Sequence, residues 1–311
     1  MPIQISRTAA LFWLLLLVST SASATYSIVA CDPQTQSCGV AVATHNLAVG
    51  NSVPFAKAGV GAGVSQFETN PLHSEALLTS LSAGDSAQRA LDLALEAGKA
   101  FGDRAGLDER QVAVVSIRGD SAAFTGESAG PVAGHRQSAY VSVQGNGLAS
   151  DEVLEAMLQT FEQHRGPLGE GLLTALEAGL AAGGQRIGVM SAALLVATPQ
   201  GWPVDIDLRV DFATGEAVHQ LRRAYNAVKA RSLVFQAGRL RARGEVEKAE
   251  ASVQSALKLA PDWDRIWLNA ARFSLAAGDR RGLQERFCRF SELNPSWSAL
   301  VLEEFESVRC Q

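Results

Sequence analysis

Strand-like and helix-like segments come in alternating batches over the first two thirds of the chain, and this order is the strongest limit on its fold. A batch of strands is followed by a pair of amphipathic helices, then by more strands, a second helix pair and two closing strands. Batches of strands separated by helix pairs indicate two antiparallel sheets that face each other between helical layers. The sequence therefore predicts an α+β fold, a four-layer αββα sandwich.

Composition and periodicity mark the individual segments. The expected strands are rich in Val and small residues between Gly and Pro, and they cover 25–31, 38–44, 59–66, 111–117, 122–125, 139–144, 192–197 and 204–210. The expected helices have apolar positions three and four apart, over 72–83, 87–101, 151–164 and 168–182. Capping residues precede two of these helices, at Ser86 and Ser150.

A change in charge near residue 215 divides the chain. Residues 25–215 carry 10 basic and 20 acidic side chains, whereas residues 216–311 carry 16 and 12. Neither part is basic or clustered enough to indicate a nucleic-acid-binding protein. The opposite signs could draw the two parts together, although ordinary solvated surfaces are the simpler interpretation. We predict one domain over 25–215 and a second over 216–311.

The second part carries a repeat. Four pairs of identical residues lie 34 positions apart, namely Gly244 and Gly278, Leu259 and Leu293, Pro261 and Pro295, and Trp263 and Trp297. A period of this length, with Pro after the second helix, resembles tetratricopeptide repeats. We expect an all-α region of about two helix hairpins over 230–308, with a long helix over 216–243 before it and a last helix over 296–308. Such a region would offer a binding surface to a protein partner.

The first 24 residues have the pattern of a secretory signal peptide. Arg7 supplies positive charge, residues 9–18 are all apolar and residues 19–24 are all small, which predicts cleavage after Ala24. An apolar run of about ten residues is far shorter than the roughly 20 that span a bilayer, and no later stretch approaches that length. No Cys follows the cleavage site to carry a lipid. We expect an exported protein, periplasmic or extracellular, with no membrane anchor after cleavage; a retained N-terminal anchor is the alternative.

The four cysteines form an even set, as disulfides in an exported chain require. Cys31 and Cys38 flank a turn-rich link between two strands, so both could lie at the neck of one hairpin. Cys288 and Cys310 fall in the C-terminal helical region. We predict two local disulfides, with buried thiols as the alternative. No Cys or His spacing matches a zinc site, and we expect neither a metal nor a cofactor.

Cleavage after Ala24 would make Thr25 the first residue of the mature chain. A threonine in this position can act as a nucleophile through its hydroxyl, with its own α-amino group as the general base, because the unperturbed pKa of that amine is roughly 7.7 to 8.0. Signal peptidases also leave Thr or Ser by chance, and cleavage two residues away would remove this chemistry. The start of the mature chain therefore decides whether Thr25 is a catalyst.

Eleven short motifs in the first part follow one order. They are Thr25-Tyr-Ser-Ile-Val-Ala, Asp32-Pro33, Ala48-Val-Gly50, Val53-Pro-Phe, Ala58-Gly-Val-Gly-Ala62, Asn70-Pro71, Arg110-Gln-Val-Ala-Val-Val, Ala133-Gly-His135, Gln144-Gly-Asn146, Ser191-Ala-Ala-Leu-Leu-Val196 and Asp207-Leu-Arg-Val-Asp211. Together they resemble the family called domain of unknown function 1028, which is assigned to the N-terminal nucleophile hydrolase superfamily. The resemblance covers nearly all of 25–211. It implies an αββα sandwich with a nucleophile at the first residue of the first strand, and it implies no substrate. Cys31 and Cys38 depart from that family, and a disulfide gained by an exported member would explain them.

Three further residues are candidates for catalytic roles beside Thr25. Thr44 ends the second strand, which in a hairpin lies opposite the start of the first. Asn146, flanked by two glycines, is the candidate donor to the tetrahedral oxyanion. Lys57 would keep a nearby α-amine neutral by like-charge repulsion. A turn asparagine and a solvated loop lysine are the alternative interpretations.

Five residues are candidates for substrate binding. His45 follows the second strand, Gln66 ends the third, and His135 lies in a Gly-His-Arg motif. Asp207 and Arg209 share a face of the last strand, because side chains two positions apart on a strand point the same way. Structural histidines and a solvent-facing row of charges are the alternatives.

Two functions from different classes remain open. The first is an exported amidohydrolase that uses Thr25 on a peptide or small amide, with the helical repeats recruiting a protein or shaping access to the site. The second is a binding or scaffold protein that keeps the fold without activity and works through its repeats. A hydroxyl at the mature N-terminus favours the first, because a binding module does not need it.

Overall fold

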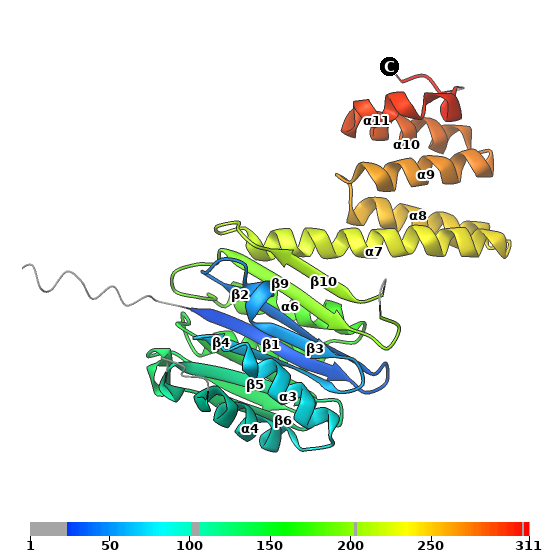
Figure 1. Ribbon diagram of the computed structural model, residues 1–311. Helices are drawn as coiled ribbons and strands as arrows, with labels where there is room; N and C mark the ends of the chain where they lie inside the picture. Colours follow the sequence, from blue (N-terminus) through cyan, green and yellow to red (C-terminus); the bar gives the residue numbers. More distant parts are fainter. Residues whose placement is uncertain (1–23, 101–105, 202–203, 307, 311) are drawn as a thin grey trace, which may run out of the picture. The chain divides into compact units, whose positions relative to one another are not determined.

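The computed structural model of the protein describes residues 24–100, 106–201, 204–306 and 308–310 (Figure 1). The predicted signal peptide therefore lies outside the described residues, apart from Ala24. The chain forms two compact units, residues 1–218 and 219–311. The boundary that the charge pattern predicts, after residue 215, falls close to this division.

The N-terminal unit has two antiparallel sheets within its described residues. Sheet A has the strand order β10-β9-β2-β1-β8-β7, and sheet B has the order β3-β4-β5-β6. The strands of sheet A are β1 (Thr25–Asp32), β2 (Ser37–Thr44), β7 (Gly134–Ser138), β8 (Val141–Asn146), β9 (Ser191–Ala197) and β10 (Ile206–Val210). Those of sheet B are β3 (Pro54–Lys57), β4 (Gly61–Phe67), β5 (Arg110–Ser116) and β6 (Ser121–Thr125).

Small apolar side chains fill the space between the two sheets. Val29 of β1 and Val42 of β2 belong to one buried cluster with Val64 of β4 and Ala113 of β5. Because side chains alternate along a strand, Thr25 and Ser27 lie on the same inner face of β1 as Val29. The inner face of β1 is therefore polar where the strand begins and apolar where it ends.

Helices cover the outer faces of both sheets. Helices α3 (Leu72–Ser82) and α4 (Ala87–Ala100) pack on sheet B, where Leu77, Leu91 and Val114 share a buried cluster. Helices α5 (Glu152–Gln163) and α6 (Leu168–Ala181) pack on sheet A. The remaining short elements are α2 (Val49–Ser52), η1 (Leu107–Glu109) and η2 (Glu127–Ala129). The expected mixture of antiparallel sheets and paired helices is present.

Two local features differ from the sequence prediction. A fourth strand of sheet B, β3, begins at Pro54 and was not predicted; Pro54 is tolerated because β3 is an edge strand. The strand expected over 139–144 corresponds to β8, and the strand before it, β7, was not predicted. Tyr140 lies in the turn between them with a φ of 66°. The sequence of β7, Gly-His-Arg-Gln-Ser, does not predict a strand because apolar and polar residues do not alternate in it.

The C-terminal unit is all helical, as expected. Its elements are α7 (Ala217–Ala242, the first two residues of which belong to the N-terminal unit), α8 (Val246–Leu259), α9 (Asp264–Ala277), α10 (Arg280–Leu293), α11 (Pro295–Leu300) and η3 (Leu302–Phe305). Helices α8 to α11 are stacked in sequence order (Figure 1). The last helix is shorter than the predicted 296–308, because it ends at Leu300 and a 3-10 turn follows. Gly244 and Gly278, one repeat period apart, adopt φ values of 77° and 70° before α8 and α10, a conformation that glycine permits.

Both expected disulfides are present. Cys31 and Cys38 are directly opposed on β1 and β2, with their Cα atoms 4.1 Å apart. Cys288 and Cys310 join α10 to the segment after η3, with a Cα separation of 5.4 Å. Disulfides are typical of proteins from oxidising compartments and are compatible with export. None of the helices in the described residues is both long and apolar enough to cross a membrane.

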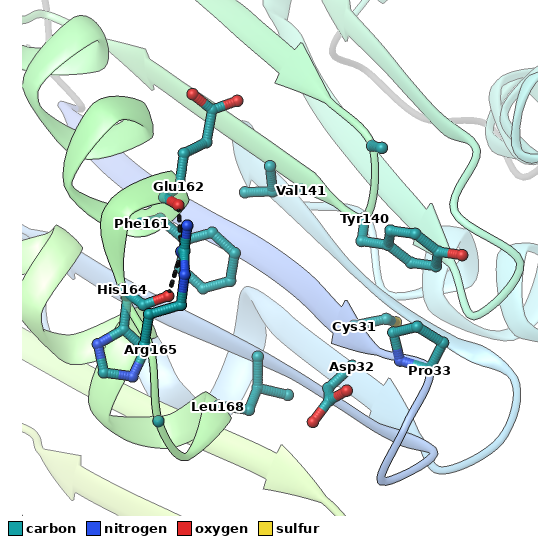
Figure 2. Close-up of a pocket in the computed structure, with 12 residues that line it drawn as sticks. Cys31, Asp32, Pro33, Tyr140, Val141, Phe161, Glu162, His164, Arg165 and Leu168 are labelled. Atoms are coloured by element: carbon teal, nitrogen blue, oxygen red, sulfur yellow. Dashed lines mark hydrogen bonds between the residues drawn. The ribbon is translucent and has the colours of Figure 1, made fainter.

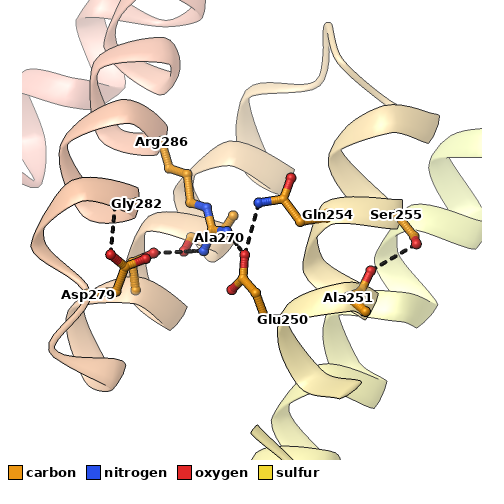
Figure 3. Close-up of polar contacts among 9 residues, drawn as sticks. Glu250, Ala251, Gln254, Ser255, Ala270, Asp279, Gly282 and Arg286 are labelled. Carbon is orange, nitrogen blue, oxygen red and sulfur yellow. Dashed lines mark hydrogen bonds and ion pairs between the residues drawn. The ribbon is translucent and has the colours of Figure 1, made fainter. Parts of the chain in front are cut away.

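A buried arginine links three helices of the C-terminal unit (Figure 3). The side chain of Arg286 in α10 is 3 % exposed and forms an ion pair with Glu250 of α8. Its Nη1 also donates to Ser274 Oγ of α9 at 2.7 Å. A buried cation depends on such partners, because burial removes its hydration.

Replacing Glu250 by Gln is therefore expected to lower the free energy of unfolding of the helical unit by about 1–3 kcal/mol, because Arg286 stays buried without its counter-charge. Urea denaturation followed by circular dichroism measures this change. Lys248→Gln is the control, since it breaks an exposed pair with Glu245 and should cost no more than about 0.5 kcal/mol. Equal effects of the two substitutions would contradict the assignment.

Candidate active site

Thr25 lies at the start of β1, between two neighbouring strands of sheet A. The register places Thr44 of β2 directly opposite Thr25 on one side and Asn146 of β8 on the other. The hairpin argument from sequence predicted the first of these neighbours. All three side chains are buried, with Thr25 only 4 % exposed.

Both polar groups of Thr25 have partners in the uncleaved chain. Its hydroxyl lies 3.0 Å from Thr44 Oγ1. Its main-chain nitrogen donates to Asn146 Oδ1 at 3.0 Å. The hydroxyl and the main-chain nitrogen of Thr25 are therefore each held by a side chain of an adjacent strand.

The orientation of the Asn146 amide is determined by a third strand. Asn146 Nδ2 donates to Gln111 Oε1 of β5 at 2.9 Å. Gln111 Nε2 in turn faces the carbonyl oxygens of Gly145 at 2.9 Å and Gly134 at 3.1 Å. If the Gln111 amide were turned around, its oxygen would face the two carbonyl oxygens, which are also acceptors. The Gln111 nitrogen must therefore point toward these carbonyl groups.

Asn146 therefore presents its oxygen, not its nitrogen, to Thr25. This differs from the role expected for Asn146 as the oxyanion donor, because its donor nitrogen is already used by Gln111. The geometry instead makes Asn146 the acceptor for the Thr25 nitrogen.

These contacts are part of a larger polar network between the sheets. Ser27 Oγ donates to Gln66 Oε1 at 2.7 Å and accepts from Gln144 Nε2 at 2.6 Å. Gln66 Nε2 then donates to Gln111 Oε1 at 2.7 Å. We call the full set the inter-sheet network; its members are Thr25, Ser27, Thr44, Gln66, Gln111, Thr125, His135, Ser142, Gln144 and Asn146. The network carries no formal charge when its single histidine is neutral.

His135 lies at the more exposed end of this network. Its Nδ1 is 3.0 Å from Thr125 Oγ1, and Gln111 Nε2 donates to the same hydroxyl at 3.0 Å. Burial, and then the nearby charge of Arg136, lower the pKa of His135 from its usual 6.5. The structure therefore connects His135 to Thr25 through Thr125, Gln111 and Asn146, without a direct contact.

His45 directly follows Thr44 and is half-buried. Its Nδ1 atom is buried and has no hydrogen-bond partner among the described residues. The position beside Thr44 agrees with the sequence prediction, but the partners of Thr25 among the described residues are Thr44 and Asn146 rather than His45. Its part in substrate binding remains a prediction.

The structure does not bring the predicted charged residues to Thr25. Lys57 is exposed and donates to Ser82 Oγ at 3.3 Å. It lies two residues from Gly59, which bonds the β1–β2 turn at Gln36, at the opposite end of sheet A from Thr25. Lys57 therefore cannot tune the Thr25 amine in the predicted way.

Asp207 and Arg209 lie on the edge strand β10 and pair with each other at 2.8 Å. Both are exposed, and two strands, β9 and β2, separate them from β1. The pair has the features of the solvent-facing charge row that the sequence left open.

Several residues of the network were not singled out from the sequence. Gln111 and Gln144 occur in Val-rich strands, where a large amide at an inward position is unusual. That pattern was the available signal, because a buried amide requires partners. Gln185, a buried residue outside this network that donates to Ala43 O, follows two glycines in a loop and gave no such signal.

A cavity of about 550 Å³ lies elsewhere on sheet A (Figure 2). Its lining includes Cys31 and Asp32 at the end of β1, Tyr140 in the β7–β8 turn, Phe161 in the last turn of α5 and Arg165 after that helix. This end of β1 is about 20 Å from Thr25 at roughly 3.3 Å per residue. Arg165 is held by the carbonyl oxygens of Glu162 and His164. The cavity is therefore separate from the Thr25 site, where a buried hydroxyl and a main-chain nitrogen have ordered partners.

Within the part of the chain that the structure describes, no group of three or more His, Cys, Asp or Glu side chains could hold a metal ion. The inter-sheet network itself consists of hydroxyls, amides and one imidazole.

The fold and site define a mixed α/β protein with two facing antiparallel sheets and a buried threonine at the start of a central strand. Residues 25–221 match the family described as a family of unknown function, DUF1028. The chain belongs to this family. It is also similar to the crystal structure of protein SPO2555 from Silicibacter pomeroyi, labelled with the same family, at 30 % sequence identity and a TM-score of 0.58 over 65 % of this chain and 88 % of that one. A comparison with curated proteins found no match.

Replacing Gln111 by Met is expected to lower the free energy of unfolding by more than about 3 kcal/mol, because the amides of Gln66 and Asn146 and two carbonyl groups lose a buried partner. Chemical denaturation measures the change. Gln88→Met, at an exposed position where the side chain bonds only Asp92, should stay within about 0.5 kcal/mol of the wild type. A small effect at Gln111 would show that the network does not stabilise the fold.

The lowered pKa of His135 predicts a pH dependence of stability. At pH values well above the usual pKa of 6.5, the ring is neutral in both the folded and the unfolded chain, so the full stability is present. As the pH falls from there toward the folded-state pKa, the unfolded chain binds the proton first and stability is lost. The free energy of unfolding should therefore fall more steeply between about pH 7 and 5 in the wild type than in His135→Gln. His219→Gln, at an exposed helix position, should keep the wild-type slope.

Proposed function

We propose that this protein is an exported amidohydrolase in which Thr25, as the first residue of the mature chain, attacks an amide or peptide bond. The observation that carries the proposal is the pairing at Thr25: its hydroxyl lies 3.0 Å from Thr44 Oγ1, and its nitrogen lies 3.0 Å from Asn146 Oδ1. A nucleophile and its base both belong to one residue, and each has a fixed partner. Hydroxyl nucleophiles require such an adjacent base.

The reaction follows from these positions. Thr25 Oγ1 bonds to the substrate carbonyl carbon, and its proton passes to the α-amine directly or through one water. The amine then gives this proton to the leaving nitrogen as the C–N bond breaks, which leaves an ester on Thr25. Water hydrolyses the ester, and the acid product and the free hydroxyl are restored.

The surroundings favour a neutral amine. The unperturbed pKa of an α-amine is roughly 7.7 to 8.0, and burial lowers it because the charged form loses hydration. The inter-sheet network adds no anion to oppose this effect. Asn146 Oδ1 then accepts a hydrogen bond from one N–H of the Thr25 amine. The lone pair of the amine nitrogen stays available for the proton of the Thr25 hydroxyl.

The architecture also supports the proposal. The presence of two antiparallel sheets and paired helices supports the αββα arrangement that the resemblance to N-terminal nucleophile hydrolases implies. The two disulfides are consistent with export. The helical unit, which we interpret as tetratricopeptide-like, would bind a protein partner or deliver one as substrate.

A binding or scaffold protein is the second candidate. Thr25 is 4 % exposed in the uncleaved chain, and the cavity near Cys31 lies at the other end of β1. A closed Thr25 site would suit a fold whose work is done by the helical repeats. The proposed enzyme and this alternative differ in whether the mature chain begins at Thr25 and turns over an amide.

N-terminal sequencing of the exported protein is the first test. The hydrolase requires a mature chain that begins at Thr25, because only then is the α-amine free. A mature chain that starts at any other residue would exclude the mechanism, whatever the fold.

Thr25 substitutions are the second test. Thr25→Ser should retain turnover of amides in a library of N-acyl amides and peptides, because the hydroxyl and the amine remain. Thr25→Ala should reduce turnover at least about 10³-fold, as expected when a nucleophile is removed, with an unchanged circular dichroism spectrum. Equal rates for wild type and Thr25→Ala would favour the scaffold.

A further inference from the structure

The carbonyl group just before Thr25 is held by two donors. Thr44 Oγ1 donates to the oxygen of Ala24 at 2.6 Å. Gln185 Nε2 donates to the same oxygen. Two donors that converge on one carbonyl oxygen form the arrangement that stabilises an oxyanion. Here the arrangement lies next to the proposed nucleophile.

Gln185 is fixed with its nitrogen toward this oxygen. The side chain is buried, with 4 % exposure, and Nε2 also donates to Ala43 O at 3.2 Å. With two carbonyl oxygens on that side, the amide oxygen must point away from them. The loop is held in place because Gln185 forms a β-bridge with Leu148, and the next nitrogen, Arg186 N, donates to Gly147 O at 3.2 Å.

The oxygen of the Gln185 amide, unlike its nitrogen, has no partner in the described part of the chain. Gln185 Oε1 is buried and has no hydrogen-bond partner among the described residues. An unpaired buried acceptor is costly, and a native protein retains few of them. A buried amide whose oxygen has no partner, next to the proposed nucleophile, indicates a side chain that binds a ligand.

We propose that Gln185 and Thr44 form the carbonyl-binding subsite of the Thr25 centre, and that this subsite holds the oxygen of the substrate acyl group after Ala24 has left. The nitrogen and Oγ1 of Thr25 are separated only by its Cα and Cβ. An acyl group on Oγ1 therefore occupies nearly the same region as the Ala24 acyl group on the nitrogen. The two donors that hold the Ala24 oxygen then hold the oxygen of the reacting carbonyl.

The subsite fits an uncharged acyl group. Thr44, Gln185 and Asn146 are neutral, so a neutral amide or peptide acyl group meets no unpaired charge there. Its oxygen gains negative charge in the tetrahedral intermediate, and the two donors are already aimed at it. Removal of one such donor typically lowers turnover by about 10²–10³-fold. This assignment depends on the proposed function, because it requires Thr25 to be the nucleophile.

A boronic acid tests the subsite without turnover. The probe is 1-acetamidoethylboronic acid, whose boron accepts Thr25 Oγ1 while the hydroxyl proton passes to the α-amine. The tetrahedral boronate then presents an oxygen in the position of the oxyanion. Mass spectrometry detects the adduct in the protein with its mature N-terminus, and ¹¹B NMR titration gives its affinity.

Gln185→Met keeps the size of the side chain and removes the donor. It is expected to weaken the boronate at least about 10-fold and to lower kcat by about 10²–10³-fold with little change in KM. Gln185→Glu has the same shape but carries an oxygen in place of Nε2, so it should weaken binding and turnover at least as much. This variant replaces Gln185→Met in the test if the Met variant does not fold. Gln159→Met, at an exposed helix position, should bind the probe as the wild type does.

The outcomes separate the two proposals. No adduct in the wild type, or the same binding in Thr25→Ala, would overturn the hydrolase itself. A second outcome is that the wild type forms the adduct on Thr25 and that the folded variants Gln185→Met and Gln185→Glu bind the probe as tightly as the wild type does. This result would overturn the subsite and leave the hydrolase intact. Weakened binding in a folded Gln185 variant, with normal binding in Gln159→Met, supports the subsite.

Discussion

The amide of Gln111 is the contact on which the arrangement at Thr25 depends. It reaches from sheet B to sheet A, accepts from Gln66 and Asn146, and donates to two main-chain carbonyl groups. Each buried amide left without partners would cost about 1–3 kcal/mol. These groups therefore favour the single orientation in which all are paired, and the Asn146 oxygen then points to Thr25. A side chain with no contact to Thr25 thus determines which atom Thr25 meets.

The hairpin of β1 and β2 could be predicted from the sequence because its register is local. A short turn brings Cys31 opposite Cys38, and the same register carries Thr25 to Thr44 at the other end. Asn146 could be proposed from its glycine neighbours but not oriented, because Gln111, which orients it, lies 35 positions away in the chain. Gln185 could not be found at all, since its contact with Ala24 spans 161 positions and its loop has no periodic pattern.

The charged candidates failed for a related reason. Sequence reasoning placed Lys57 near Thr25 because a cation there would suit the chemistry, and no local pattern contradicted it. The sheet order decides otherwise: Lys57 ends an edge strand beside the Cys31–Cys38 end of β1. The inner face of β1 changes from Thr25 and Ser27 to Val29, so polar partners can be buried only at its start. An unpaired charge at that end would lose its hydration, whereas amides and hydroxyls can pair completely.

This neutrality bears on how the proposed centre is assembled. In the uncleaved chain the Thr25 nitrogen is a peptide N–H that already donates to Asn146, and the Ala24 oxygen already occupies the donors of Thr44 and Gln185. Breaking the Ala24–Thr25 bond turns that nitrogen into a base and, once Ala24 leaves, frees both donors. No side chain has to move to complete the site, because each partner is held by the sheets or by the Leu148 bridge. In the proposed enzyme, the polar groups that stabilise the precursor would also be the groups that act on the substrate, and the cost of organising them would already be met in folding.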